Sequence, residues 1–499
     1  MMNVRHRTGF ILSIFLFVLM QYLPVFPSES VANMASIASL MVVLWITEAL
    51  PLAATALLPL VLFPLMGITS AKVVASVYTN STIFLFIGGF VLALSMQRWD
   101  LHTRIALRII GWFHGSAMFM VLGFMVTAAF LSMWISNTAT ATMLLPIGLA
   151  VYSRAAENLD AADSQKLLTA LMLGIAYSCS IGGTGTLIGT PPNLAMQRIF
   201  EISFPLAPSI SFAQWLVFAF TLSLSMLLLC WLLLSWRYTG RQFTALSFSP
   251  DTLYRSSHKP MSFEEKAVAG VFTLTALAWV FRQDINLGWL SIPGWSNTFA
   301  TGALINDGSV AIIAALLLFA IPAKDRTRHT RLADAETISA LPWNIVLLFG
   351  GGFALAKGFT VSGLAEFVGQ QFIGMQDMNP VSLIAGVSTM VVFLTEVTSN
   401  TATAEMLLPL VASIAKSIQI NPLLLMLPVT LSASMAFMMP VATPPNAIVF
   451  ASGKLDIMDM IKTGFFLNLF AIILITLVTW FIAPMVFGID LNTMPEWAQ

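Results

Sequence analysis

The sequence is poor in charged residues. Only 9% of its 499 residues are Asp, Glu, Lys or Arg, whereas soluble globular proteins carry about 25%. Hydrophobic residues make up 58% of the chain, and its mean hydropathy is +0.87. So few charges do not cover a water-facing surface of this size. The composition therefore excludes a cytosolic enzyme, a secreted domain and a disordered chain.

An excess of one charge sign is also missing, and so is a cysteine cluster. The 23 basic residues equal the 23 acidic ones, so the chain lacks the basic footprint of a nucleic-acid-binding protein. Its two cysteines, Cys179 and Cys230, lie inside apolar stretches without metal-ligand spacing. Two such residues do not build a disulfide framework. We expect no nucleic-acid partner and no cysteine metal site.

Long apolar runs are present instead, many of them near the roughly 20 residues that span about 30 Å of hydrocarbon. The chain is predicted to be an all-α polytopic membrane protein with 11 transmembrane helices plus two re-entrant hairpins. The hairpins are expected at 117–150 and 381–415, which are too long for one span and are interrupted by Ser-Asn-Thr. The other apolar segments are 10–26, 33–50, 53–68, 82–97, 168–200, 212–235, 267–282, 303–321, 343–358, 422–450 and 464–487. No convincing cleavage site follows the first run, so we expect a retained helix rather than a signal peptide.

Basic residues predict the orientation, because cytoplasmic loops carry an excess of Lys and Arg. With the N-terminus inside, all but five of the 23 basic residues fall on the inner side; the outer ones are Lys72, Arg198, Arg282, Lys357 and Lys416. The tail after residue 487 holds acidic but no basic residues. The sequence thus predicts a multi-pass protein of a bacterial inner membrane, with a cytoplasmic N-terminus and an outer C-terminus.

The chain contains an internal repeat that coincides with interruptions of its apolar segments. Residues 136–146, SNTATATMLLP, recur as 399–409, SNTATAEMLLP, with ten of eleven positions identical. LFIGGF at 85–90 matches LFGGGF at 348–353, and TPPN at 190–193 matches TPPN at 443–446. The predicted topology gives the two copies opposite orientations. Inverted repeats with discontinuous helices are typical of secondary transporters, whose site lies between the halves near the membrane midplane.

Physical chemistry explains why these breaks suit a binding site. Irregular backbone at membrane depth is tolerated only where it is buried in protein or lines a cavity. Such breaks expose carbonyl groups, which coordinate Na⁺, and helix N-termini, which favour anions. The repeated motifs contain no Lys or Arg. An anionic substrate would therefore need co-bound cations together with helix N-termini, which favours coupling to Na⁺ over an arginine clamp.

Three acidic residues lie close to or inside the predicted spans: Glu48, Glu396 and Glu405. Acids at membrane depth are candidates for function. For Glu48 and Glu396 the alternative is an interfacial carboxylate that hydrogen-bonds a helix end. Glu405 replaces Thr142 of the other copy, and its role stays open at this stage.

These motifs resemble those of the divalent anion:sodium symporter (DASS) family, the INDY-type sodium/dicarboxylate transporters. The similarity covers nearly the whole chain. It includes WITEALP at 45–51, both Ser-Asn-Thr tips and both Thr-Pro-Pro-Asn loops, and it is most specific in SMAFMMPVATPPN at 434–446. The resemblance implies a homodimer in which a transport domain moves across the membrane past a scaffold domain, as an elevator-type transporter.

The resemblance also implies the residues of the site. Substrate contacts would come from both tips and both broken helices, namely Asn137, Thr138, Thr190, Asn400, Thr401, Thr403, Thr443 and Pro444. One Na⁺ would be held by Ser132, Ser136, Asn137 and Gly189, and a second by Thr395, Thr398, Asn400 and Ala442. Ser132 and Thr395 occupy equivalent positions of the repeat, so both cation sites look intact. This favours a symporter over the exchangers of the family.

The expected domains follow the same division. Residues 1–113 and 267–378 would form the scaffold, 114–235 and 379–499 the transport domain, and 236–266 a cytoplasmic linker. The expected function is Na⁺-coupled uptake of a C4-dicarboxylate such as succinate, malate or fumarate, because two near-equivalent tips suit a substrate with two anionic ends. The alternatives within the family are dicarboxylate exchange and Na⁺-coupled citrate or sulfate symport. A membrane enzyme would need a nucleophile–base pair or a metal cluster, and a channel a continuous polar pore; the sequence shows neither.

Overall fold

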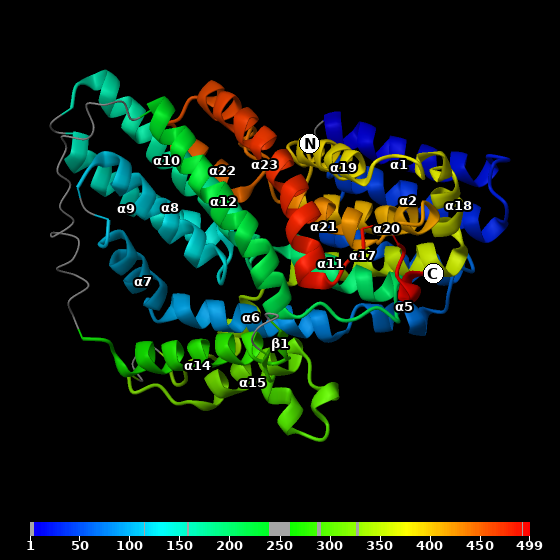
Figure 1. Cartoon of the computed structure of the whole chain (residues 1–499), viewed down its shortest axis with the longest axis horizontal. Helices are drawn as coiled ribbons and strands as arrows, with labels where there is room; N and C mark the ends of the chain where they lie inside the picture. Colours follow the sequence, from blue (N-terminus) through cyan, green and yellow to red (C-terminus); the bar gives the residue numbers. More distant parts are fainter. Residues whose placement is uncertain are drawn as a thin grey trace.

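The computed structural model describes residues 4–113, 115–156, 159–238, 260–286, 291–325, 329–491 and 493–499, and these form an assembly of packed helices (Figure 1). The helices of the first half are α1 (Val4–Tyr22), α2 (Glu29–Thr47), α3 (Leu52–Thr55), α4 (Leu58–Leu65), α5 (Ala71–Val77), α6 (Ser81–Arg98), α7 (Leu101–Ile110), α8 (Ala117–Ser132), α9 (Asn137–Ala155), α10 (Ala161–Gly183), α11 (Pro191–Ser203) and α12 (Phe212–Tyr238).

The second half begins at α14 and contains one small pair of strands. Its helices are α14 (Phe263–Val280), α15 (Asp307–Ala320), α16 (Ala335–Ser339), α17 (Trp343–Ser362), α18 (Leu364–Gln370), α19 (Pro380–Thr395), α20 (Asn400–Ser417), α21 (Leu423–Ser432), α22 (Pro444–Ala451) and α23 (Ile457–Phe487). Strands β1 (Ile285–Asn286) and β2 (Ser291–Ile292) pair antiparallel. Short 3₁₀ turns are η3 (Trp295–Thr298), η4 (Gly302–Leu304), η5 (Ile373–Met375) and η6 (Glu496–Ala498).

The predicted breaks are present, and the repeat is visible in the helix ends. Each of the two long apolar segments folds as two helices with a short break, between Ser132 and Asn137 and between Thr395 and Asn400. Helices α8 and α19, α9 and α20, and α11 and α22 begin at equivalent residues of the two copies. Before the hairpins, the chain turns at a left-handed residue in both halves, Asp100 (φ 54°) and Gly363 (φ 82°).

Six of the described helices are by themselves long and apolar enough to cross a membrane: α2, the stretch Ala71–Arg98, α10, α12, α17 and α23. The remaining apolar helices are shorter, because Pro, Gly and polar residues divide them; the expected span 53–68, for example, is split into α3 and α4. The first helix runs from Val4 to Tyr22 rather than over 10–26, since prolines follow at 24 and 27 and proline cannot continue a helix. Most of the expected linker 236–266 lies outside the described residues.

Helix α10 lies at the centre of its half. Within its most apolar stretch 94% of the residues are buried, against 39% in α12 and 33% in α23. Helices α8, α9, α12 and α22 pack around it (Figure 1). The more exposed apolar faces of α12 and α23 suit contact with lipid.

Replacing Gly182 by alanine is expected to push α8 and α10 apart. A Cβ atom on Gly182 would lie 2.2 Å from the Ala129 carbonyl oxygen and 2.3 Å from its Cα, and backbone cannot move aside locally. Overpacking of this kind costs about 1–3 kcal/mol. We expect Gly182→Ala to lower the thermal unfolding temperature of the purified protein. Gly270→Ala is the control, because a Cβ there meets nothing within 4 Å; equal unfolding temperatures would contradict this close approach.

Candidate substrate and cation site

A cavity of about 530 Å³ lies where the two hairpin tips and the two broken helices meet. The tips contribute Ser136–Thr138 and Val397–Thr401. The segments that precede α11 and α22 contribute Ile188–Pro191 and Val441–Pro445. Residues more than 300 positions apart in the sequence therefore share one wall.

Most of the residues expected at the site line this cavity. They are Ser136, Asn137, Thr138, Gly189, Thr190, Thr398, Asn400, Thr401, Ala442, Thr443 and Pro444. Ser132 and Thr395 are fully buried behind the tips and do not reach the cavity. Thr403 does not reach it either, because its hydroxyl lies 2.6 Å from the Thr398 hydroxyl inside the second hairpin. This position braces the tip.

Four helices begin at the cavity wall. Asn137 starts α9, Pro191 starts α11, Asn400 starts α20 and Pro444 starts α22. A helix N-terminus presents unpaired N–H groups and about half a positive charge, which attracts anions. Among the described residues that line the cavity there is no Lys or Arg. The groups that can attract an anion here are therefore the N–H groups at these helix starts, while Glu48 is an acidic residue in the same wall.

The first expected cation set has an oxygen without a partner. The Asn137 Oδ1 atom is buried and accepts no hydrogen bond from any residue that the structure describes. It lies against Gly183, where a Cβ would stand 2.7 Å from it. A Cβ on Gly189 would in turn lie 2.4 Å from the Gly183 carbonyl oxygen and 2.9 Å from that of Ser132. Because unpaired buried oxygens are costly and hard cations take oxygen ligands, this arrangement fits Na⁺.

The second set is arranged differently. The Thr395 hydroxyl lies 2.8 Å from Asn400 Oδ1 and 2.9 Å from the carbonyl oxygen of Ala433. A threonine hydroxyl carries one proton, so it does not satisfy both acceptors fully. Three oxygens thus converge here with a single proton between them, which also fits a cation.

The asparagines of the two Thr-Pro-Pro-Asn motifs hold the breaks in shape. The Asn193 amide donates to the carbonyl oxygens of Thr186 at 2.7 Å and Thr184 at 3.2 Å. The Asn446 amide donates to those of Ala436 at 3.2 Å and Met439 at 3.1 Å. Both asparagines are fully buried. They satisfy carbonyl groups that the interrupted helices leave unpaired.

Glu396 braces the second break from the opposite side. Its carboxylate accepts backbone N–H groups from three successive residues, Phe437 at 2.7 Å, Met438 at 2.9 and 3.1 Å, and Met439 at 2.9 Å. It also accepts the Asn468 amide at 2.8 Å. Of the two readings open for Glu396, the contacts support the one in which a carboxylate satisfies backbone N–H groups.

The remaining wall of the cavity comes from other helices, and the sequence reasoning missed most of it. Phe90 of α6, Asn344 of α17 and Glu48 after α2 line it. Glu48 was singled out as an acid near a span, but not as part of this cavity. Phe90 belongs to the repeated LFIGGF motif, but its equivalent in the other copy, Phe353, is fully buried and does not line the cavity. Asn344 occupies the position equivalent to Ser81 in the other copy, and nothing in a single sequence indicates that it lines the cavity.

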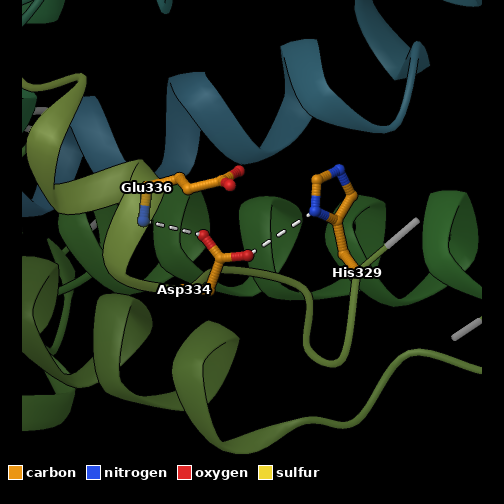
Figure 2. Close-up of side chains that lie close together, drawn as sticks. All are labelled: His329, Asp334 and Glu336. Atoms are coloured by element: carbon orange, nitrogen blue, oxygen red, sulfur yellow. Dashed lines mark hydrogen bonds and ion pairs between the residues drawn. The ribbon is translucent and has the colours of Figure 1, made fainter. Parts of the chain in front are cut away.

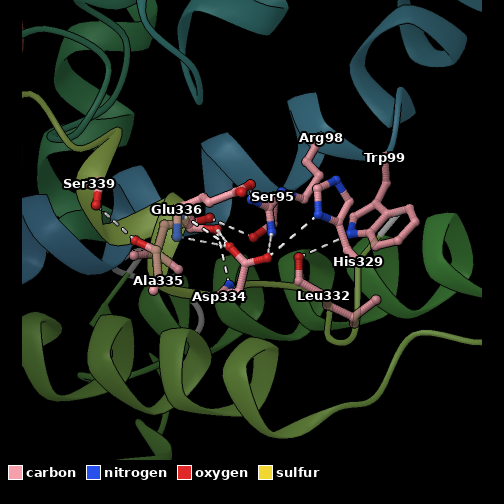
Figure 3. A network of polar contacts seen from close by, with 11 residues as sticks. Ser95, Arg98, Trp99, His329, Leu332, Asp334, Ala335, Glu336 and Ser339 are labelled. Carbon is pink, nitrogen blue, oxygen red and sulfur yellow. Dashed lines mark hydrogen bonds and ion pairs between the residues drawn. The ribbon is translucent and has the colours of Figure 1, made fainter. Parts of the chain in front are cut away.

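A second cluster of polar side chains lies away from the cavity. Figure 2 shows His329, Asp334 and Glu336 together, with His329 Nδ1 3.5 Å from an Asp334 carboxylate oxygen. Arg98 already occupies this carboxylate, at 2.7 Å, and lies 3.3 Å from Glu336 (Figure 3). Partial burial acts to raise the pKa of Asp334, but hydrogen bonds and charge from Arg98 outweigh it and hold that pKa below its usual value. Because both carboxylates are paired to the Arg98 guanidinium, the cluster links α6 to α16.

Comparison with known proteins places the chain in a family. The family model described as the sodium:sulfate symporter transmembrane region matches residues 5–488. The sodium-dependent dicarboxylate transporter SdcS of Staphylococcus saprophyticus is 41% identical over 98% of this chain and 94% of the relative. SdcS of Staphylococcus aureus strain RF122 is 42% identical over 90% of this chain and 85% of the relative.

Two solved structures share the fold at low sequence identity. One is MtrF of Neisseria gonorrhoeae, from a class of antimetabolite efflux pumps, with a TM-score of 0.56, 12% identity, and coverage of 99% of this chain and 97% of that one. The other is the YdaH transporter of Alcanivorax borkumensis, with a TM-score of 0.54, 13% identity, and coverage of 80% and 84%. The fold is thus that of helical membrane transporters. The chain belongs to the sodium:sulfate symporter family, the DASS family that its motifs resemble, and it is a transporter and not an enzyme.

Proposed function

We propose that this chain couples Na⁺ to the uptake of C4-dicarboxylates such as succinate, malate or fumarate. The observation that carries the proposal is the single cavity at which two repeated tips and four helix N-termini converge. Two equivalent tips offer the two ends of a dianion the same N–H and amide groups. The names of the SdcS relatives, which specify sodium and dicarboxylates, support this substrate and this ion.

The residues of the cavity wall then take separate roles. Asn137 and Thr138 from one tip and Asn400 and Thr401 from the other would bind the carboxylates, beside Thr190, Thr443 and Pro444. The buried oxygens around Asn137 and Gly189, with Ser132 and Ser136, would hold one Na⁺. Those around Thr395 and Asn400, with Thr398 and Ala442, would hold the second. Bound cations offset the charge of the dianion, which the cavity wall itself does not neutralise.

The packing of the two hairpins supports alternating access. Helix α20 packs extensively against α17 and α18, whereas the equivalent α9 makes no extensive contact with α6. Thr138 at the first tip is exposed, and Thr401 at the second is half-buried. We infer a state in which the cavity opens beside the first hairpin, on the predicted cytoplasmic side. If α9 packed on α6 and α20 left α17, the cavity would open beside the second hairpin, on the other side of the membrane.

The larger architecture follows from this inference. Residues 1–113 and 267–378 would form a scaffold, and 114–235 and 379–499 an elevator-like transport domain, in an inverted repeat with 11 spans and two re-entrant hairpins. The N-terminus would be cytoplasmic and the C-terminus outside, in the inner membrane of a bacterium. We propose a homodimer, as the family resemblance implies.

Radiolabelled succinate uptake into proteoliposomes tests the proposed function. We expect concentrative uptake with an inward Na⁺ gradient and none when K⁺ replaces Na⁺. Uptake that ignores Na⁺ but requires dicarboxylate inside the vesicles would identify an exchanger instead. Absence of succinate flux in both conditions, with Na⁺-driven flux of citrate or sulfate, would overturn the dicarboxylate assignment.

A further inference from the structure

Glu405 is a fully buried carboxyl group that has no partner. It lies on α20, and its exposed fraction is 0%. Neither of its carboxyl oxygens has a hydrogen-bond partner among the described residues. It does not line the cavity, and nothing in the proposed transport site uses it.

The side chain is enclosed where α20 meets α17. A Cβ on Gly352 would lie 2.6 Å from the Glu405 Cδ and Oε2 atoms, so only a glycine leaves room for the carboxyl group there. The neighbours of Glu405 along α20, Ala402 and Met406, belong to an apolar cluster with residues of α2, α4 and α17. Within the part of the chain that the structure describes, no donor and no basic side chain lies at hydrogen-bond distance from its oxygens.

A carboxyl group in such surroundings is neutral. Transfer of an unpaired charge into an apolar site is so unfavourable that the group binds a proton instead. The titratable group that faces Glu405 is the Tyr78 phenol, between α5 and α6, whose hydroxyl donates to the Ala56 carbonyl. Gly352 presents only backbone from α17. Among the described residues these contacts leave a proton as the one cation that can neutralise the carboxyl.

The repeat indicates what happens to this group when the hairpins exchange roles. The equivalent residue in the first half is Thr142, which is exposed and donates only to the Thr138 carbonyl oxygen along its own helix. Thr142 is exposed because α9 does not pack on α6 as α20 packs on α17. In the state with the contacts exchanged, Glu405 would take the exposed environment that Thr142 has here.

We propose that Glu405 is a proton-binding site that allows α20 to pack on α17 only while it is protonated. When α20 leaves α17, the carboxyl group meets water, where a glutamate ionises with a pKa near 4.3. Each docking event near neutral pH therefore takes up one proton from water, and each separation releases one. The proposal rests on the alternating access proposed above and adds a pH dependence to it.

Linkage fixes the size of the effect. Between the pKa of the exposed carboxyl and that of the enclosed one, the docked state binds one proton more than the separated state. The ratio of docked to separated molecules should then fall about tenfold for each unit of rising pH. Glu405→Gln carries no titratable group, so its ratio should not change with pH.

Distances between two spin labels measure this ratio without substrate or transport. We would place them at Ser153→Cys on α9 and Ser339→Cys on α16, which are both exposed. The native Cys179 and Cys230 are buried and do not compete for label. Helix α9 packs on α10 and α22, and α20 packs on α11 and α21. Helices α12 and α23 contact each other and join the two pairs, because α12 packs on α10 and α23 on α21. Helix α9 should therefore report the movement of α20.

In the labelled protein with Glu405, the ratio of docked to separated molecules should fall about 100-fold between pH 6 and pH 8. In Glu405→Gln this ratio should stay constant. Glu366→Gln is the matched control, since Glu366 is exposed on α18, and it should behave as the unmodified chain does. A ratio that is constant with pH in the unmodified chain, or that changes equally in Glu405→Gln, would overturn the proposal.

Infrared spectroscopy gives a second readout, which detects the bound proton of the docked state directly and needs no spin labels. The full-length protein at pH 7 should show the carbonyl band of a protonated carboxylic acid that Glu405→Thr and Glu405→Gln lack. Absence of such a band would overturn the proton site. Failure of succinate uptake alone would overturn the transport assignment and leave both of these measurements decisive for Glu405.

Discussion

Asn137→Ala is expected to reduce Na⁺-dependent dicarboxylate uptake by about 100-fold or more. Its Oδ1 atom is the unpartnered buried oxygen beside Gly183 and Gly189, and its backbone opens α9 at the cavity. Hydrogen bonds to charged groups contribute about 1.5–3 kcal/mol each, and one side chain would here serve both the substrate and a cation. Uptake of labelled succinate, with Na⁺ varied at fixed substrate, measures the loss.

Thr142→Ala is the matched control for this change. Thr142 lies on the same helix, is exposed, and its hydroxyl donates to the Thr138 carbonyl oxygen of that helix, so we expect uptake within twofold of the unmodified protein. Asn400→Ala should resemble Asn137→Ala, because the two tips line the same cavity. Normal uptake by Asn137→Ala in correctly folded protein would show that the buried oxygens around Gly189 hold no transported cation.

Glu396→Ala is expected to destabilise the segment 437–439 at the second helix break, and with it the whole protein. The substitution removes the acceptor of three backbone N–H groups and of the Asn468 amide; Phe437 and Asn468 are fully buried, and Met438 and Met439 are half-buried. Each unpaired buried donor costs about 1–3 kcal/mol, so the summed loss is on the order of 4 kcal/mol or more. Thermal unfolding of the purified protein should show a lower midpoint, together with loss of uptake.

The exposed Glu366 again supplies the control, and Glu366→Ala should unfold at the temperature of the unmodified protein. Glu396→Gln keeps one acceptor oxygen and should fall between the two. If Glu396→Ala were as stable as Glu366→Ala, the segment 437–439 would have to find other partners for its N–H groups, and the bracing role would be wrong.

The sequence was sufficient to predict the helix breaks and the hairpin tips, and that the site lies between the two halves of the repeat. Each of these depends on residues that repeat, and the second copy of a motif such as SNTATAEMLLP makes a chance polar interruption implausible. Helix ends at Ser132, Asn137, Thr395 and Asn400 agree with it. The family resemblance supplied the tip residues Asn137, Thr138, Asn400 and Thr401, and all four line one cavity.

Other features depend on packing between helices and could not be predicted. Thr403 shares the motif of the tip residues, yet its position along α20 turns it toward Thr398 and away from the cavity. Asn344 reaches the cavity from a helix whose first turn carries no motif. Glu396, directly after α19, and Glu405, on α20, have the same chemistry, but Glu396 is surrounded by N–H donors and Glu405 lies beside an apolar cluster. Only the fold distinguishes them.

The helix N-termini at the cavity also bear on how such carriers diversify. Their N–H groups belong to the main chain, so a change of side chain leaves the attraction for anions in place. Mutation at the tips can then exchange one oxyanion for another in small steps, and no intermediate protein along the way need lose its ability to bind a negative ion. The family model named for sulfate and the relatives named for dicarboxylates both specify oxyanions, the class of ligand that main-chain N–H groups attract.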